Sequence, residues 1–291
     1  MNRYVLFLGC TTPTKVPQYE LASRWVCKYF GIDLVDIEEF GCCGINQVNL
    51  SIEAGLLMAA SNLALAEDKK LDILTLCAAC TGAMAEAIEK LKDKPTKDRV
   101  NEKLREVNLE YKGSVKVKHI SRVLYEDIGV EKIKREVKKD LSGLRIAPHY
   151  GCHYLKPKSA FEGFEEPDNP RTLHQLISAT GAYSIEYETF NLCCGGKVFP
   201  VSRDLVHSLV QKKLDDIAGK KIDAMVLQCQ TCYLMYSDQQ EEINQEYGKQ
   251  YDFPVILYPQ FLGLALGADP VKDLGLKLHT VSVDTVLEKI V

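Results

Sequence analysis

Short apolar runs alternate with longer stretches of helical periodicity along this 291-residue chain. The first of these runs, at 4–8, is continuously apolar, as strands buried on both faces of a sheet are. Six runs predict strands: 4–8, 71–76, 115–119, 144–147, 222–227 and 254–258. Between them, apolar residues recur at helical spacing, for example at 52–65 and 205–217. This alternation is typical of βαβ units and predicts an α/β fold with parallel sheets.

The predicted elements occur twice in the same order, which indicates an internal repeat. Each half closes with a matching strand and helix: 115–119 with 120–128, and 254–258 with 261–266. We therefore predict two pseudo-symmetric, Rossmann-like halves, each built on a parallel sheet. The first domain is placed at 1–142 and the second at 143–291, with a charged helical segment at 130–139 bridging them. The stretch 90–112, rich in Lys and Glu, is most simply a solvated helical surface.

Ten of the eleven cysteines follow one pattern written twice: a single Cys, a Cys-Cys-Gly, then a Cys-x-x-Cys. The first set is Cys10, Cys42, Cys43, Cys77 and Cys80, and the second is Cys152, Cys193, Cys194, Cys229 and Cys232. Between the second and third elements lie 33 residues in one set and 34 in the other, and between the first two lie 31 and 40. The repeated order and spacing indicate two equivalent sites. Cys27 lies outside the pattern, in an apolar helical stretch, and is expected to be a small buried hydrophobe.

The cysteines lie where elements of secondary structure end. Cys10 and Cys77 follow predicted strands of the first half, and Cys152 and Cys229 follow their counterparts in the second. Open α/β sheets place their sites at the carboxyl ends of parallel strands. The glycine after each Cys pair permits positive φ and a close approach of the backbone to a bound group, although an ordinary turn glycine would look the same. We therefore expect one site at the carboxyl edge of each sheet.

Sets of five thiols restrict the kind of metal site. Tetrahedral zinc is filled by four ligands, so five thiols per set favour iron–sulfur clusters. A zinc protein with purely structural cysteines stays the weakest alternative. No Gly-x-Gly-x-x-Gly lies between a predicted strand and helix, so no flavin or nicotinamide site is expected in this chain.

Composition and charge narrow the class of protein further. Hydrophobic residues make up 46% and charged residues 26% of the chain, as in an ordinary globular protein. The net charge of −4 gives no reason to expect nucleic acid or an anionic membrane surface as a partner. The start of the sequence lacks a signal-peptide pattern, and no run of about eighteen apolar residues predicts a membrane span. We expect a cytoplasmic location, where this many cysteines are better explained by metal binding than by disulfides.

The doubled Cys, Cys-Cys-Gly, Cys-x-x-Cys arrangement closely resembles the CCG domain, and the two copies cover nearly the whole chain. The CCG domain occurs in the B subunit of methanogen heterodisulfide reductases. It also occurs in parts of succinate dehydrogenases, thiol:fumarate reductases and glycolate or lactate oxidation complexes. Two complete copies without a ferredoxin-like segment are most similar to the family of heterodisulfide reductase B subunits.

The resemblance implies two noncubane [4Fe–4S] clusters, each bound by the five cysteines of one set. It also implies an oxidoreductase of methanogenesis that cleaves the mixed disulfide of coenzyme M and coenzyme B to two thiols between the clusters. The implied partners are the ferredoxin-like iron–sulfur C subunit and the flavin-containing A subunit of heterodisulfide reductase, with a hydrogenase or formate dehydrogenase beyond. The alternative is an electron-transfer CCG subunit of a succinate/fumarate or glycolate/lactate oxidoreductase complex.

Four polar side chains outside the cysteine sets are candidates for contact with this substrate. His153 directly follows a predicted ligand and is the proposed catalytic donor of a proton or hydrogen bond to a leaving thiolate, the alternative being a bond to nearby backbone. The implied substrate carries anionic groups at both ends, so cationic side chains are needed. Lys156, Lys158 and Lys197 are the predicted substrate-binding residues, although any one alone is typical of a surface charge. The loop 156–170 is predicted to cover the cavity.

Overall fold

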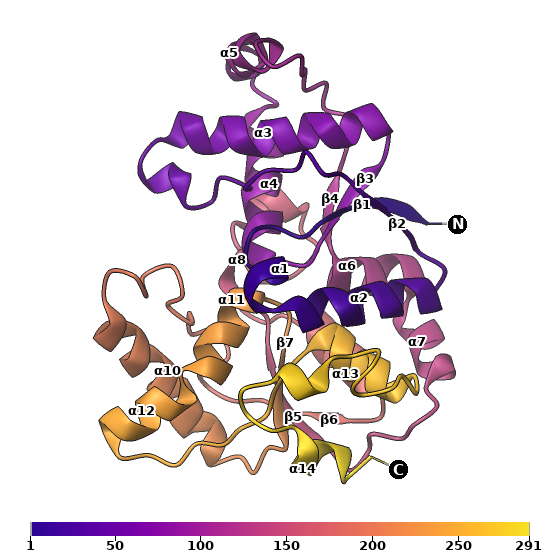
Figure 1. Cartoon of the computed structure of the whole chain (residues 1–291), viewed down its shortest axis with the longest axis vertical. Helices are drawn as coiled ribbons and strands as arrows, with labels where there is room; N and C mark the ends of the chain where they lie inside the picture. Colours follow the sequence, from indigo (N-terminus) through magenta and orange to yellow (C-terminus); the bar gives the residue numbers. More distant parts are fainter. Residues whose placement is uncertain (1, 291) are drawn as a thin grey trace.

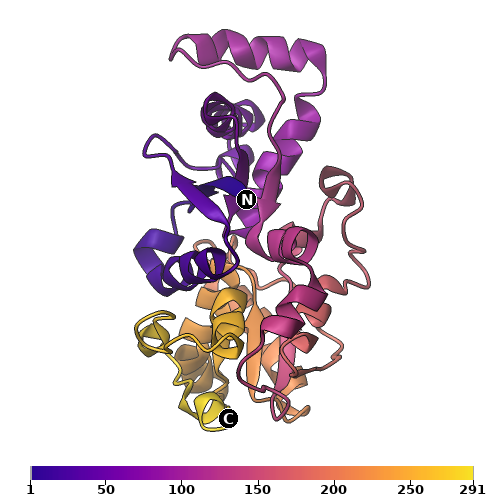
Figure 2. The ribbon, with the colours of Figure 1, turned by 90° about the vertical axis from the view of Figure 1, so that its right-hand side faces the viewer.

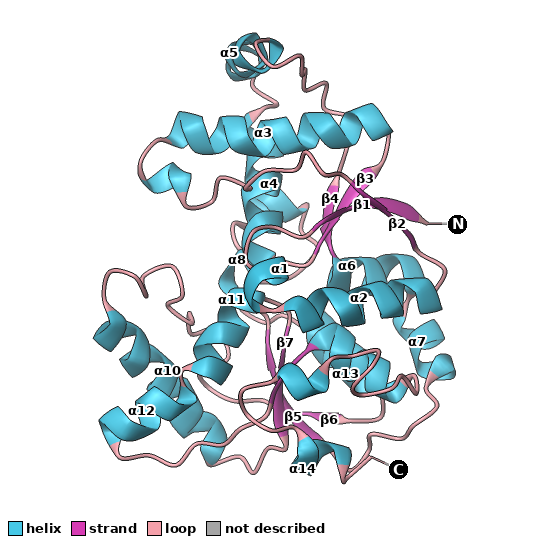
Figure 3. Ribbon diagram, in the orientation of Figure 1, coloured by secondary structure: helices cyan, strands magenta, loops and turns pink. Residues whose placement is uncertain are grey.

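The computed structural model describes residues 2–290 and contains two four-stranded parallel sheets, one in each half of the chain (Figures 1 and 3). The first sheet has the order β2-β1-β3-β4 and the second the order β6-β5-β7-β8. The strands are β1 (Arg3–Phe7), β2 (Asp33–Asp36), β3 (Asp72–Thr75), β4 (Val117–His119), β5 (Arg145–His149), β6 (Tyr183–Ser184), β7 (Ala224–Leu227) and β8 (Val255–Leu257). The α/β class and the two Rossmann-like halves predicted from the sequence are confirmed.

The helices cover the faces of the sheets and their ends (Figures 1 and 3). They are α1 (Thr12–Lys15), α2 (Pro17–Tyr29), α3 (Ile52–Lys69), α4 (Ala78–Lys90), α5 (Lys94–Arg105), α6 (Ile120–Val123), α7 (Val130–Glu136), α8 (Cys152–Leu155), α9 (Thr172–Ser178), α10 (Arg203–Ala218), α11 (Gln230–Tyr233), α12 (Gln240–Tyr247), α13 (Tyr258–Ala265) and α14 (Asp284–Leu287). Short 3₁₀ turns lie at Gln47–Asn49, Lys158–Phe161 and Leu276–Leu278, and π turns continue α6 at Leu124–Ile128 and α11 at Leu234–Asp238. None of the helices within residues 2–290 combines the length and apolarity needed to cross a bilayer.

Two of the four edge strands, β2 and β6, were not predicted from the sequence, and β6 is the shorter for a clear reason. Ile185 donates its N–H to the carbonyl of Ile146 at 2.9 Å, as a parallel ladder requires. The next donor in that ladder would be residue 148, which is a proline and has no N–H. The corresponding residue of the first half is Leu6, which pairs with Asp36 and lets β2 continue. Pairing between β5 and β6 therefore stops after two residues.

The two halves pack closely against each other (Figure 2). Helix α2 of the first half lies against α13 of the second, and α4 lies against α8. From α2, the buried hydroxyl of Tyr19 donates a hydrogen bond to the carbonyl of Gln228 at 3.4 Å. One continuous core includes buried side chains from both halves, such as Leu74 and Leu227. Since this core crosses the predicted boundary at 142/143, the boundary stays a prediction.

Two further expectations about individual segments can be compared with the structure. Cys27 is fully buried in the core between the halves, and burial raises the pKa of its thiol to about 12, as expected for a residue that acts as a hydrophobe. The stretch 90–112 contains α5, which projects from the end of the first half (Figure 1). Most of α5 is solvated and only Val100, Asn101 and Leu104 are buried, as predicted for this charged segment.

Candidate functional site

The cysteines that follow the central strands meet at the boundary between the two halves. Cys77 follows β3 and Cys229 follows β7, and each is the N-cap residue of the next helix, α4 or α11. The Cys77 thiol accepts the backbone N–H of Cys80 at 3.3 Å. The side chains of Cys77 and Cys229 interact directly, and Cys229 raises the pKa of the Cys77 thiol. Because both residues lie at the carboxyl ends of their strands, the two cysteine sets adjoin at this contact.

The second set is gathered around one small space. Its five cysteines all line a cavity of about 80 Å³. The Cys232 thiol lies 3.4 Å from the sulfur of Cys194, and Cys152 interacts with Cys193. Cys194, Cys229 and Cys232 are buried, whereas Cys152 is half-buried and Cys193 is exposed. Ala78 and Ala79 of the first half complete the wall, so the cavity belongs to both halves.

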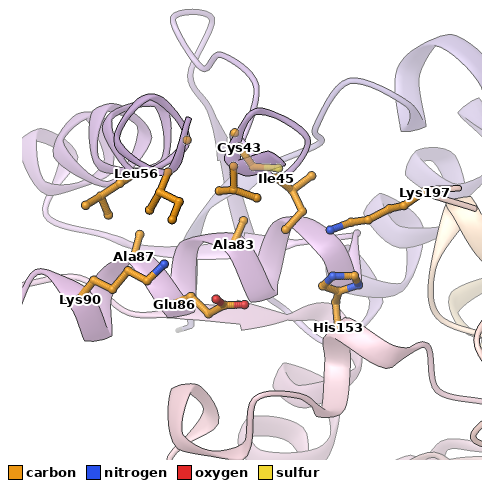
Figure 4. A pocket seen from close by; sticks show the side chains of 13 residues that line it. Cys43, Ile45, Leu56, Ala83, Glu86, Ala87, Lys90, His153 and Lys197 are labelled. Carbon is orange, nitrogen blue, oxygen red and sulfur yellow. The ribbon is translucent and has the colours of Figure 1, made fainter. Parts of the chain in front are cut away.

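The first set is less completely gathered. Cys43, Cys77 and Cys80 are buried together, and Cys43 and Cys80 interact through their thiols. Cys42 adjoins Cys43 and is half-buried, whereas Cys10 is exposed and has its thiol 3.7 Å from the hydroxyl of Thr11. Only Cys43 of this set lines the neighbouring cavity of about 180 Å³ (Figure 4). The structure thus brings four cysteines of the first set together, with Cys10 at the edge.

The thiols influence one another because they lie close together. The pKa of Cys43 is lowered to about 7, chiefly because the Cys80 thiol donates a hydrogen bond to it. The pKa of Cys229 falls well below its usual range, chiefly through its hydrogen bond with Cys232, whose own pKa rises. Cys193 and Cys152 form a similar pair, in which the pKa of Cys193 is lowered and that of Cys152 is raised. Each half therefore has at least one thiol whose thiolate form is favoured, Cys43 in the first and Cys193 and Cys229 in the second, and the thiolate is the form of cysteine that binds metal.

The glycines predicted to matter do adopt positive φ, 79° at Gly44 and 73° at Gly195. At Gly44 a Cβ atom would lie 2.5 Å from the carbonyl oxygen of Gly55 in α3, and at Gly195 it would lie 2.9 Å from Val206 in α10. The glycine therefore allows the Cys-Cys loop to lie against the helix behind it. Two other glycines leave room beside the sulfurs. A Cβ at Gly9 would lie 3.1 Å from the sulfur of Cys80, and one at Gly151 would lie 3.8 Å from that of Cys232.

These donors suit an iron–sulfur cluster better than a hard cation. Sulfur is the donor atom in both sets, and thiolates select iron–sulfur clusters, zinc and copper(I) over oxygen-preferring metals. Glycines rather than larger residues flank the sulfurs of Cys80 and Cys232, so no side chain from these positions occupies the space beside them, and the five cysteines of the second set line a cavity. Within residues 2–290, no three Cys, His, Asp or Glu side chains converge on the position of a single metal ion. The residues present fit a cluster in each half.

His153 and Lys197 lie between the two sites and line both cavities. Figure 4 shows Lys197 extending toward the ring of His153 at one end of the larger cavity. The Nδ1 atom of His153 lies 3.2 Å from the Cys152 sulfur. Burial, and secondarily the charge of Lys197, lowers the pKa of His153. Helix α8 can lie this close to α4 because residue 82 is a glycine, whose Cβ would be 3.1 Å from the carbonyl of His153.

Lys156 and Lys158 lie away from both cavities. Each is exposed, and Lys158 forms an ion pair with Glu166 within its own loop. The loop 156–170 packs through Lys158–Phe161 against α4, and Phe164 lies under the guanidinium of Arg122 at 4.4 Å. Glu165 fixes its far end by accepting the backbone N–H groups of Arg171 and Thr172. The loop therefore flanks the first half, and a substrate-binding role for these two lysines stays a prediction.

One buried polar pair behind the second set was not predicted. Lys213 of α10 is fully buried and donates to the carbonyl of Phe190 at 2.9 Å and to Nδ1 of His149 at 3.2 Å. The sequence carried a signal for this burial, because Lys213 continues the apolar positions Val206, Val210 and Ile217 along one face of the helix.

Comparison with known proteins identifies the family. A model of the CCG cysteine-rich domain matches residues 4–85 and again residues 146–237. The chain belongs to the CCG cysteine-rich domain family, as the resemblance in its sequence predicted.

Individual relatives span the whole chain. It is 35% identical over 295 residues to the B subunit of the ferredoxin:CoB–CoM heterodisulfide reductase of Methanosarcina mazei, covering 100% of this chain and 97% of that protein. It is 31% identical over 281 residues to the 8-methylmenaquinol:fumarate reductase membrane anchor subunit of Wolinella succinogenes, with 96% and 97% covered. A crystal structure of a hypothetical protein from Helicobacter pylori has the same fold, with a TM-score of 0.76 at 16% identity over 97% of this chain and 52% of that chain.

Proposed function

We propose that this protein is the catalytic iron–sulfur subunit of a heterodisulfide reductase. Each set of five cysteines binds one noncubane [4Fe–4S] cluster, and the disulfide of coenzyme M and coenzyme B is reduced between them. When bound, the clusters supply the two electrons that reduction of a disulfide to two thiols requires. The full-length similarity to a heterodisulfide reductase B subunit supports this assignment.

One observation carries the proposal: the two cysteine sets adjoin at the contact between Cys77 and Cys229. A disulfide must receive two electrons, whereas one iron–sulfur cluster ordinarily transfers one at a time. Two adjoining sites, reached through cavities that share His153 and Lys197, suit the delivery of one electron to each sulfur. A protein that only relays electrons along a chain has no need for cavities lined by a histidine and a lysine beside its clusters.

His153 and Lys197 are assigned separate tasks in these cavities. His153 donates a hydrogen bond or proton to the thiolate that leaves, because it lines both cavities and lies beside Cys152. Lys197 attracts an anionic group of the substrate, since its ammonium lines the same space. The roles of the ten cysteines, His153 and Lys197 are all part of the proposal.

The chain is expected to receive its electrons from other polypeptides. We propose a ferredoxin-like C subunit and a flavin-containing A subunit as partners in a multi-subunit complex, with a hydrogenase or formate dehydrogenase upstream, in the cytoplasm. The similarity to one subunit of a heterodisulfide reductase supports a complex of this kind. Alone, the chain should turn over with an artificial low-potential donor and show little activity with a pyridine nucleotide.

The proposal is tested on protein purified anaerobically. Two four-iron clusters require about eight irons and eight sulfides per chain, and reduced viologen should then drive cleavage of the heterodisulfide to two thiols. Stoichiometric zinc with negligible iron would refute both cluster assignments. Full iron content with no thiol release would refute the catalytic role.

A second candidate function has one observation in its favour, the 31% identity to a fumarate reductase membrane anchor subunit. In that case the chain transfers electrons in a succinate/fumarate complex and another polypeptide performs the chemistry. Loaded protein that is reduced and reoxidised reversibly but leaves the heterodisulfide intact would favour this alternative.

A further inference from the structure

The protein buries an amine directly behind the second cysteine set. The side chain of Lys213 is fully buried, between the rings of Tyr187 and Tyr236 at 5.3 and 5.6 Å. Its hydrogen bonds go to the carbonyl of Phe190 and to Nδ1 of His149. Burying a lysine costs free energy unless the charge is compensated, so a neutral side chain would be expected here if packing were the only requirement.

The three equivalent positions in the first half carry no ionisable side chain. Lys213 lies nineteen residues after Cys194, and Asn62 lies nineteen residues after Cys43. His149 precedes Cys152 by three residues, as Phe7 precedes Cys10, and Tyr236 follows Cys232 by four, as Met84 follows Cys80. The residues behind the set are thus Phe7, Asn62 and Met84 in the first half and His149, Lys213 and Tyr236 in the second. The two sites therefore differ in polarity although their cysteines match.

The need to hold the Cys-Cys loop in place does not explain why residue 213 is a lysine. Asn62 does this in the first half with a neutral amide, which donates to the carbonyl of Cys42 at 3.1 Å and accepts the N–H of Gly41 at 2.9 Å. Lys213 holds the corresponding loop through Phe190 alone. An amide would be enough for that hydrogen bond. The amine differs from an amide in that it can carry a positive charge, and we therefore look for a role of that charge.

Two further polar atoms behind the second set have no partner within residues 2–290. They are Nε2 of His149 and the hydroxyl of Tyr236, and both are buried. When Lys213 is an ammonium it can only donate, so Nδ1 of His149 accepts from it and the proton of the neutral imidazole lies on Nε2. Buried donors are rarely left unpaired, which suggests that they serve a group bound at this site.

We propose that Lys213, with His149 and Tyr236, makes the cluster of the second half more easily reduced than that of the first. This rests on the proposed function, because it requires a cluster in each half. Reduction adds one electron, and therefore one negative charge, to the cluster. A buried ammonium stabilises that charge strongly because little water screens it, and hydrogen bonds and local charge are known determinants of cluster potential. Lys213 would therefore not touch the substrate. It would raise the reduction potential of the second cluster through the electric field of its charge.

Burial also allows the amine to take up a proton when the electron arrives. Desolvation lowers the pKa of Lys213 to about 7, while Cys232, Cys194, Asp216 and Cys193 oppose this shift. His149 stays neutral near pH 7, where Lys213 titrates, because burial, and secondarily the charge of Lys213, holds the pKa of His149 well below its usual range. Added negative charge raises the pKa of Lys213. One electron entering the second cluster is then accompanied by one proton passing from water to the amine.

The test compares reduction potentials in loaded protein. Both clusters are titrated under anaerobic conditions at pH 8 and followed by electron paramagnetic resonance, with Cys43→Ala and Cys194→Ala used to assign each signal to its half. Lys213→Asn places in the second half the residue type that the first half has at the equivalent position, Asn62. It should make reduction of the second cluster at least about tenfold less favourable, a shift of about 59 mV for one electron, and leave the first cluster unchanged.

Lys212→Asn is the matched control, because it removes an exposed lysine one position away. It should move neither potential, and Lys213→Arg should retain most of the difference between the clusters. Should Lys213→Asn fail to fold, His149→Phe tests the same pocket and should lower the same potential. An unchanged second potential in a fully loaded variant overturns the inference alone. Wild-type protein without iron and sulfide overturns the proposed function itself.

Discussion

The two halves share one fold and one cysteine pattern but differ in what surrounds the cysteines. In the second half all five cysteines line one cavity, and a lysine, a histidine and a tyrosine lie behind them. In the first half Cys10 lies at the edge and the corresponding residues behind the set are Asn62, Phe7 and Met84. The repeated fold therefore has the same cysteine pattern in both halves but different surroundings behind the cysteines.

This difference suggests that the two sites do different work on one substrate. If both clusters had equal environments, nothing in the protein would direct the order in which electrons arrive. The second half also supplies both residues that line the two cavities in common, His153 and Lys197, whereas Glu86 and Lys90 of the first half line only the larger cavity. We therefore propose that the second half binds the substrate and donates the proton, through Lys197 and His153. The first half would supply the other cluster across the boundary.

The largest expected effect comes from removing the fifth ligand in either half. A regular [4Fe–4S] cluster needs four thiolates, so Cys43→Ala or Cys194→Ala can retain iron in a cubane. The substrate-accepting geometry is lost, and heterodisulfide reduction should fall at least about 100-fold. Iron content, electron paramagnetic resonance and thiol release are measured on each variant. Full activity with an unchanged spectrum in either variant would show that its half holds no five-ligand cluster.

His153→Ala should have the next largest effect, because no other group in the shared cavity is assigned to donate to the leaving thiolate. Loss of a general acid typically costs about 10²–10⁴-fold in rate. Thr11 follows Cys10 as His153 follows Cys152, so Thr11→Ala is the matched control and should stay within about threefold of wild type. Steady-state heterodisulfide reduction at constant iron content gives the comparison. Equal effects of the two substitutions would mean that the polar residues of the second half have no special role.

The two potentials should also respond differently to pH. Below pH 7 the amine of Lys213 is charged in both redox states, so the second potential should be flat. Above pH 7 it is neutral while the cluster is oxidised and protonated once the cluster is reduced. Reduction then consumes a proton, and the potential should fall by up to about 59 mV per pH unit. Redox titrations from pH 6 to 9 measure this slope. A flat second potential, or one that falls in parallel with the first, contradicts the coupling.

The smallest effects are expected at the glycines behind the cysteine pairs. Gly44→Ala brings a Cβ to 2.5 Å from a backbone carbonyl, whereas Gly195→Ala meets the side chain of Val206 at 2.9 Å. Both substitutions are strained because φ is positive, which costs about 1–3 kcal/mol. The first should be the more destabilising, since a side chain yields more easily than backbone. Apparent melting temperatures of the loaded variants test this order, and a larger loss in Gly195→Ala would reverse it.

Much of this arrangement was accessible from the sequence, because it depends on local patterns. The apolar runs predicted six strands, and the repeated spacing predicted two equivalent sites at their carboxyl ends. The edge strands β2 and β6 were missed, since Asp33–Asp36 has charged ends and β6 has only two residues. The contact between Cys77 and Cys229 depends on how distant segments pack, so no local pattern reveals it. The helical spacing of apolar residues in α10 indicates that Lys213 is buried, but not which groups surround its amine.

The two sites are proposed to act together on one disulfide, and a single-turnover experiment is the most direct test of this cooperation. Loaded protein is fully reduced, freed of excess reductant and mixed anaerobically with the heterodisulfide, and the thiols released are counted. We predict one disulfide cleaved per chain, giving two thiols, with both cluster signals reoxidised together. We also predict no cleavage when Cys43→Ala or Cys194→Ala leaves only one intact site. Two results would contradict the proposal. One is thiol release with reoxidation of only one cluster, and the other is the absence of thiol release although both clusters are intact and reduced.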